Sequence, residues 1–135
     1  MKRWRYKPQM VAAELDLDFT HAKRTVAPHG DALYSAEYRI PASLRGLLRG
    51  RRVAIVDDVI HAGSAARATH AELLACGAQP VAIGTLLLLG NTVAASAAAQ
   101  QIALEWVERM PSHLWEPRDC PLCAARMPLE RPAAA

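Results

Sequence analysis

The chain has 135 residues, 52% of them hydrophobic and 5% aromatic, and a formal charge of +3. This length predicts one domain with a single core. The positive charge is mild and scattered, and no groove-reading helix or basic–aromatic repeat is visible, so a nucleic-acid partner is not expected.

Membrane insertion is not expected either. The longest apolar run, Val81 to Leu89, is bounded by Pro80 and Gly90 and is too short to span a bilayer. The basic first residues lack the apolar stretch of a signal peptide. The odd number of cysteines, 3, favours reduced thiols. These features predict a cytoplasmic protein.

Hydrophobic periodicity and turn residues predict short elements in the first half of the chain. In order, these are a helix ending across residues 10–15, a short strand with alternating residues over 17–21, a loop or hairpin over 23–37, a strand near 38–40 and a helical turn over 43–48.

The second half shows stronger patterns. We expect a strand over 53–56, a helix from Ser64 to Cys76 that ends at Gly77, a strand over Val81–Leu89, an Ala-rich helix over Thr92–Gln100 and a strand over Ile102–Val107. Strands that alternate with helices predict an α/β fold with a mostly parallel sheet flanked by helices. Ligands of such sheets bind at the carboxyl ends of the strands.

One run of residues combines several features of a phosphate site. An apolar strand leads into Asp57 and Asp58, and the small-residue turn Ala62-Gly63-Ser64-Ala65 follows, with Ser64 expected to cap the next helix. Carboxylates accept hydrogen bonds from vicinal hydroxyls, and N–H groups at a helix N-terminus bind phosphate. Together they predict a site for a ribose 5-phosphate.

This run resembles the PRPP-binding motif of the type I phosphoribosyltransferases, and most closely that of the orotate phosphoribosyltransferases. His61 and Ser64 replace two threonines of the orotate motif, and Ala62 is typical of that branch. Two other interpretations are a response-regulator receiver domain and a solvated acid pair. A receiver needs a later strand-ending Lys, and no Lys follows Lys23.

The resemblance extends to a loop upstream of the motif. Lys23 and Arg24 match a basic pair, and His29-Gly30 matches a His-Gly pair, in a loop that closes over PRPP in the family. Ala27 stands where the family carries a lysine, so one cation for the departing pyrophosphate is missing. The alternative interpretation is an ordinary solvated turn.

The resemblance begins at about Met10, which suggests that a strand and a glycine turn of the family are missing upstream. We therefore divide the chain into an atypical N-terminal segment (1–9), a phosphoribosyltransferase core (10–118) and a tail containing Cys and Pro (119–135).

Two further pairs of residues, one of cysteines and one of tryptophans, are candidates for a site. Cys120 and Cys123 form half of a zinc-binding pattern, for which His113, Cys76 or a second copy would have to add ligands. Trp106 and Trp115 are interpreted as packing residues rather than platforms for a base.

The resemblance implies a homodimeric enzyme that transfers 5-phosphoribosyl from PRPP to a nucleobase and releases pyrophosphate, with orotate as the leading acceptor and Mg²⁺ bound mainly by PRPP. Asp57 and Asp58 would be catalytic. The PRPP-binding residues would be these two together with Lys23, Arg24, His29, His61, Ala62, Gly63, Ser64 and Ala65. The alternative is a catalytically impaired member of the fold that senses nucleotides or binds a partner.

Overall fold

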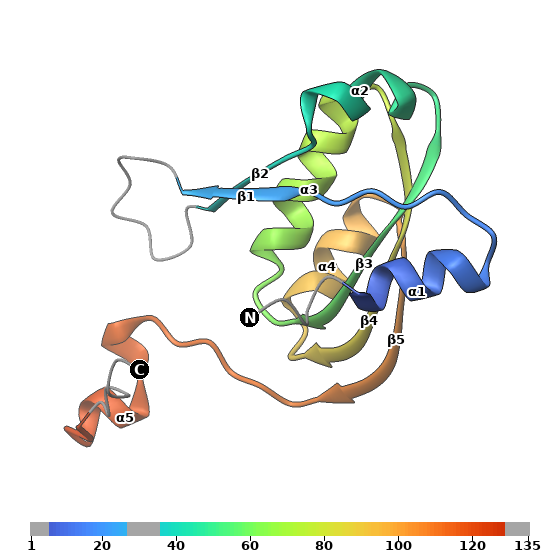
Figure 1. The fold of residues 1–135 in the computed structure, drawn as a ribbon. Coiled ribbons are helices and arrows are strands. Elements are labelled where there is room, and N and C mark those ends of the chain that lie inside the picture. Colours follow the sequence, from blue (N-terminus) through green and yellow to red (C-terminus); the bar gives the residue numbers. More distant parts are fainter. Residues whose placement is uncertain (1–5, 27–35, 129–135) are drawn as a thin grey trace.

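The computed structural model describes residues 6–26 and 36–128 (Figure 1). Its helices are α1 (Tyr6–Glu14), α2 (Ala42–Leu48), α3 (Ser64–Ala75), α4 (Thr92–Ala99), the short 3-10 helix η1 (Pro117–Asp119) and α5 (Pro121–Ala124). Its strands are β1 (Lys23–Val26), β2 (Ala36–Arg39), β3 (Arg52–Ile60), β4 (Gln79–Leu89) and β5 (Ala103–Met110).

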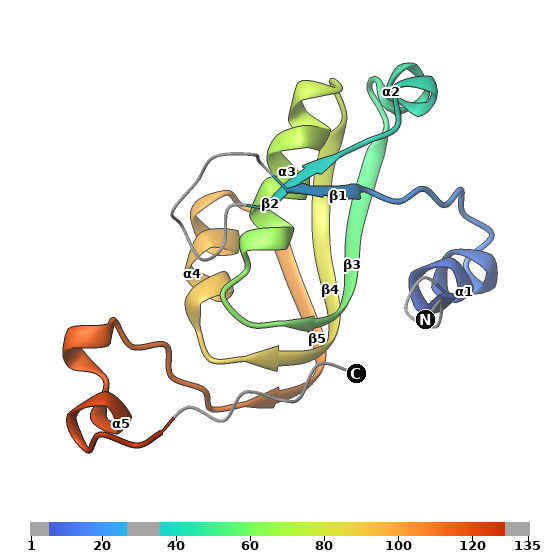
Figure 2. The same ribbon diagram turned by 60° about the vertical axis from the view of Figure 1, so that its left-hand side comes forward.

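Strands β3, β4 and β5 form a parallel three-stranded sheet in that order. Each of the first two strands is followed by a helix that leads to its parallel neighbour, which confirms the predicted α/β fold. Helices α3 and α4 pack on one side of the sheet, and α1 lies on the other (Figures 1 and 2). The carboxyl ends of the three strands therefore meet at one edge, beside the start of α3.

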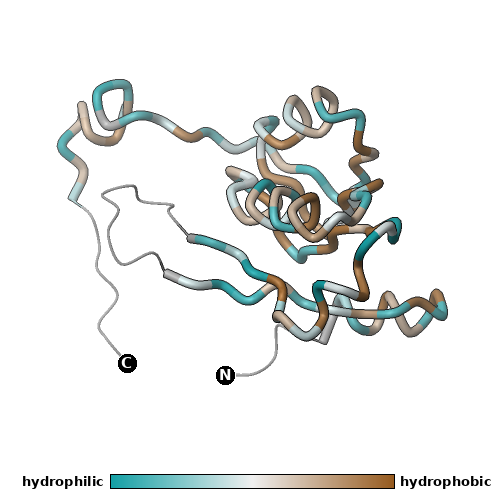
Figure 3. The backbone as a smooth tube through the Cα atoms, turned by 90° about the horizontal axis from the view of Figure 1, so that it is seen from above, coloured by the Kyte–Doolittle hydropathy of each residue, from teal (hydrophilic) through white to brown (hydrophobic). Residues whose placement is uncertain are grey.

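The core lies between the sheet and helices α3 and α4. Leu73 of α3 and Leu88 of β4 are its largest fully buried side chains. The other well-buried apolar residues are Ile40, Ile55, Ile60, Ala66, Cys76, Ala78, Ile83, Val93, Ala97 and Ile102. Hydrophobic residues follow the sheet and its helices, whereas the β1–β2 pair is mostly hydrophilic (Figure 3).

Helix α3 ends as the sequence predicts. Gly77 adopts φ +75°, a left-handed conformation that favours glycine. The N–H of Gly77 donates to the carbonyl of Leu74 at 2.9 Å, and the N–H of Ala78 donates to that of Leu73 at 3.0 Å. This pair of bonds is a Schellman motif, which satisfies the last carbonyls of the helix and turns the chain into β4.

The strand predicted over residues 17–21 is wrong. Leu17 instead closes the end of α1, where its N–H donates to the carbonyl of Ala12 at 2.8 Å and Asp16 has φ +51°. The Leu17 side chain is 62% exposed, so the alternating pattern does not bury a face. The strand forms later, at β1, because there the chain finds an antiparallel partner in β2, with Lys23 opposite Arg39.

The chain after β5 runs away from the sheet to η1 and α5 (Figures 1 and 2). In the part of the chain that the structure describes, no helix has the length and apolar character that crossing a membrane requires.

Candidate functional site

The acid pair lies inside β3 rather than at its end. Asp57 and Asp58 are followed by Val59, which is paired with Leu87 of β4, and by Ile60, the last residue of the strand. The predicted strand end was therefore too early by several residues. The two carboxylates remain in the last third of the strand, close to the turn that leads into α3.

Local hydrogen bonds fix the two carboxylates. Oδ1 of Asp57 accepts from the N–H of Asp58 at 2.9 Å, and Oδ1 of Asp58 accepts from the N–H of Val59 at 2.9 Å. On the neighbouring strand the buried Thr85 hydroxyl donates to the carbonyl of Asp58 at 3.2 Å. Each carboxylate thus keeps acceptor capacity for hydroxyl donors of a ligand.

The environment of Asp57 disfavours its charge. Burial raises the pKa of its carboxyl above the ordinary 3.8, the hydrogen bond from the Asp58 N–H acts in the opposite direction, and the Asp58 carboxyl adds to the rise. A carboxylate whose ionisation is disfavoured in the folded protein is a common feature of binding and catalytic sites.

This shift predicts that Asp57→Asn is more stable than the parent at neutral pH. Between pH 3.8 and the raised pKa the folded state binds more protons than the unfolded state, so stability falls as pH rises through that window. Thermal melts from pH 3 to 8 should show the gain at pH 7 and its loss toward the acidic end. Asp18→Asn, at an exposed position, is the control. A difference between Asp57→Asn and parent that does not change with pH would contradict the interpretation.

The turn after β3 requires a glycine. Gly63 has φ +73° and is the N-cap residue of α3. A Cβ built on it would lie 2.2 Å from Cγ2 of Val93 on α4, so the turn packs against α4 too closely for any side chain. The start of α3 is therefore held against α4 in one conformation.

The predicted capping role of Ser64 is wrong. Ser64 is the first residue of α3, and among the described residues no side chain caps this helix. The first N–H groups of a helix have no partner within the helix, and here no cap competes for them. Residues Ala62 to Ala65 thus present a backbone nest for an anion, at a helix end where the macrodipole also favours negative charge.

Arg67 is a candidate site residue that the sequence analysis missed. Its Nη1 donates to the carbonyl of Ala62 at 2.6 Å, which folds the guanidinium back over the turn. The exposed guanidinium places a positive charge beside the nest. The signal was present in the sequence, because Arg67 follows Gly63 by one helical turn and its side chain can reach back toward the helix start.

His61, which follows β3, makes a polar contact with the segment that follows β5. Its Nε2 lies 2.9 Å from Oγ of Ser112, which follows β5. Near the same edge Arg109 donates to Oδ1 of Asn91 at 2.9 Å and to the carbonyl of Gly90 at 3.3 Å. Polar contacts thus connect the turn after β3 to the segment that follows β5, and the turn after β4 to the last residues of β5.

The basic pair lies in β1 rather than in a loop. Lys23 and Arg24 are its first two residues, and successive side chains of a strand point to opposite faces. In β1 these two side chains therefore start from opposite faces of the β1–β2 pair. His29, Gly30 and Ala27 lie outside the described residues.

A cavity of about 310 Å³ adjoins the acid pair on the α1 side of the sheet. Its lining includes Asp57, Asp58, Thr85, Trp106 and Val11 of α1. Trp106 is 44% exposed and lines this cavity, so its interpretation as a packing residue stays a prediction.

The cysteine pair forms a small turn of its own. The N–H of Cys123 lies 3.4 Å from Sγ of Cys120, and this contact lowers the pKa of the Cys120 thiol. Cys76 is buried in the core, and His113 stacks on Trp115, which is 48% exposed. Over residues 6–26 and 36–128 no three His, Cys, Asp or Glu side chains gather as metal ligands.

No protein-family model matches the sequence, and no curated protein matches it. Solved structures do resemble the fold. The adenine phosphoribosyltransferase of Leishmania donovani superposes with a TM-score of 0.54 at 20% identity, over 75% of this chain and 50% of that one. The enzyme of Leishmania tarentolae gives 0.55 at 18%, over 78% and 60%.

The adenine phosphoribosyltransferase of Trypanosoma brucei, solved with AMP, pyrophosphate and ribose-5-phosphate, gives a TM-score of 0.55 at 17% identity, over 87% of this chain and 61% of that one. This chain thus covers between 50% and 61% of these three enzymes. At such identities the likeness establishes the fold. The chain has the α/β fold of the phosphoribosyltransferases.

Proposed function

We propose that this protein binds PRPP at the end of β3 and transfers its phosphoribosyl group to a nucleobase. The observation that carries this proposal is the sequence Asp57-Asp58 followed by a turn whose glycine is held against Val93, so that the start of α3 is fixed next to two carboxylates. Ribose hydroxyls and a 5-phosphate require these two kinds of group at short separation. The solved Trypanosoma brucei enzyme with ribose-5-phosphate and pyrophosphate supports the ligand class.

In the proposed reaction the C1–O bond to pyrophosphate breaks and its electron pair leaves with pyrophosphate. A ring nitrogen of the base forms the new bond to C1 and gives its proton to the released pyrophosphate. Asp57 and Asp58 hold the ribose hydroxyls and stabilise positive charge that develops on the sugar. The nest holds the 5-phosphate, and a cation of the β1–β2 ribbon, Lys23 or Arg24, meets the departing pyrophosphate.

Magnesium enters with PRPP in this proposal. The two carboxylates are the hard oxygen donors that Mg²⁺ prefers, so the residues present fit such an ion. When bound, Mg²⁺ would neutralise charge on the pyrophosphate.

The second candidate function is nucleotide or PRPP binding without turnover. It is favoured by Ala27, which stands where the family that the motif resembles carries a lysine, so that one cation for the departing pyrophosphate is missing. If the protein bound PRPP and the transition state of the transfer equally well, it would have affinity for PRPP but would not accelerate the reaction.

We expect the chain to turn over orotate slowly or not at all, because Ala27 replaces a cation that would stabilise pyrophosphate. Restoring one such group, in Ala27→Lys, should raise the rate about a hundredfold. The assay follows PRPP-dependent consumption of orotate, adenine and other bases. It has Asp58→Asn as the inactive reference.

Base consumption that depends on Asp58 would support the enzyme. PRPP binding with no consumption of any base, with and without Ala27→Lys, would favour the second candidate. Rapid orotate turnover by the parent chain would contradict the expected role of a loop cation.

A further inference from the structure

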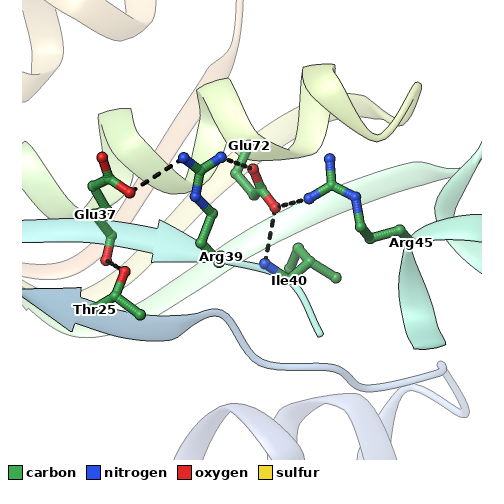
Figure 4. A network of polar contacts seen from close by, with 6 residues as sticks. All are labelled: Thr25, Glu37, Arg39, Ile40, Arg45 and Glu72. Carbon is green, nitrogen blue, oxygen red and sulfur yellow. Dashed lines mark hydrogen bonds and ion pairs between the residues drawn. The ribbon is translucent and has the colours of Figure 1, made fainter. Parts of the chain in front are cut away.

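A buried carboxylate joins the β1–β2 ribbon to helix α3. Glu72 of α3 is 4% exposed. Its Oε1 accepts from the backbone N–H of Ile40 at 3.0 Å and from Nη1 of Arg45, and its Oε2 accepts from Nη1 of Arg39 at 3.3 Å (Figure 4). One side chain thus holds the end of β2, the residue after it and helix α2.

The arrangement satisfies the requirement for burying a charge. An ionised carboxylate is costly inside a protein unless it is paired and hydrogen-bonded, and Glu72 has two guanidinium partners and one backbone donor. Removal of one partner of such a cluster leaves uncompensated charge. The cluster therefore fixes one geometry between α3 and the ribbon.

Arg39 connects this cluster to the cationic end of the ribbon. It lies directly opposite Lys23 in the β1–β2 register, so the two positive side chains share a face. Like charges in that position repel each other. Glu72 on one side and Glu37, at 3.2 Å, on the other draw the Arg39 guanidinium into ion pairs and offset the repulsion.

Helix α3 connects the phosphate nest to the Glu72 cluster. Its first residues belong to the phosphate nest, and Glu72 lies two turns further along the same helix. A helix is stiff over this length, so whatever Glu72 holds has a set distance from the nest.

We propose that Glu72 is a positioning residue that fixes the ribbon cations, Lys23 and Arg24, relative to the phosphate nest. This inference rests on the proposed function. It concerns a residue that touches no substrate and acts through Arg39 and Ile40.

The test compares two ligands that differ by the pyrophosphate. Ribose 5-phosphate contacts the acid pair and the nest alone, whereas PRPP also needs a ribbon cation. We expect Glu72→Gln and Arg39→Gln to weaken PRPP binding by at least about tenfold, the lower range for one hydrogen bond to a charged group. Ribose 5-phosphate affinity should stay within about twofold.

Matched controls carry the same charge changes elsewhere. Glu14→Gln lies at an exposed position of α1, and Arg118→Gln removes the exposed ion pair with Asp119. Both should bind PRPP like the parent. Unchanged PRPP affinity in Glu72→Gln, or an equal loss for both ligands, would overturn the inference.

Hydrogen–deuterium exchange tests, without any ligand, whether Glu72 holds the β1–β2 ribbon on α3. Glu72→Gln and Arg39→Gln should speed exchange at the Ile40 amide and in the ribbon and leave β4 amides around Leu88 unchanged. If the ribbon amides exchanged equally fast in the variants and in the parent, the proposed role of Glu72 would be overturned even if the parent bound no PRPP. A parent that binds neither ligand while the ribbon amides respond as expected would contradict the proposed function instead.

Discussion

Gly63→Ala is expected to lower the free energy of unfolding by about 2–5 kcal/mol and to abolish binding of ribose 5-phosphate. A methyl group at this position meets a left-handed φ of +73° and Cγ2 of Val93 at 2.2 Å. Left-handed strain costs about 1–2 kcal/mol and overpacking about 1–3 kcal/mol. Because the start of α3 must move to relieve the contact, the nest loses its geometry. Urea unfolding and calorimetric titration measure the two effects.

A second glycine separates strain from contact. Gly50 has a similar φ of +71° but nothing within 4 Å of a built Cβ, so Gly50→Ala should show the strain alone. Val93→Ala removes the clashing Cγ2 and leaves Cβ at 3.5 Å from the built methyl group. Gly63→Ala should therefore cost less in a Val93→Ala background. Additive effects of the two substitutions would contradict the close packing of the turn.

Asp58→Asn is expected to weaken binding of PRPP by about tenfold to a hundredfold, the value of one hydrogen bond to a charged group. The asparagine keeps the size of the side chain but accepts more weakly from ribose hydroxyls. Ser64→Ala should have a smaller effect, since the described structure gives its side chain no capping bond. Titration with and without Mg²⁺ measures both.

Asp119→Asn is the control for this series, because Asp119 is exposed and lies in η1. Its PRPP affinity should equal that of the parent. If Asp58→Asn also binds like the parent, the acid pair does not hold the ribose and the ligand site lies elsewhere.

The second half of the fold could be predicted from sequence because its signals are local and strong. The apolar runs that form β3 and β4, and Gly77 at the end of α3, each determine an element within a few residues. Residues 17–21 carried an equally regular alternation but found no partner strand. Strand formation depends on pairing partners that a single run of residues does not reveal.

The candidate site, too, could be predicted from the sequence only in part. The acid pair and the turn around Gly63 could be predicted because they are adjacent in the chain. The contacts of Glu72 with Ile40 and Arg39 join residues 32 and 33 positions apart, and the approach of Val93 to Gly63 joins two helices. No periodicity or motif in the sequence indicates such pairings, so they emerged from the structure alone.

We expect the phosphoribosyl group to bind where β3 meets α3. An amide NMR titration of the parent protein with ribose 5-phosphate tests this expectation most directly. The largest shifts should occur at Asp58 and at the N–H groups of Ala62 to Ala65, and they should be lost in Gly63→Ala. Saturable shifts confined to another part of the chain, or no shift at these amides, would contradict it.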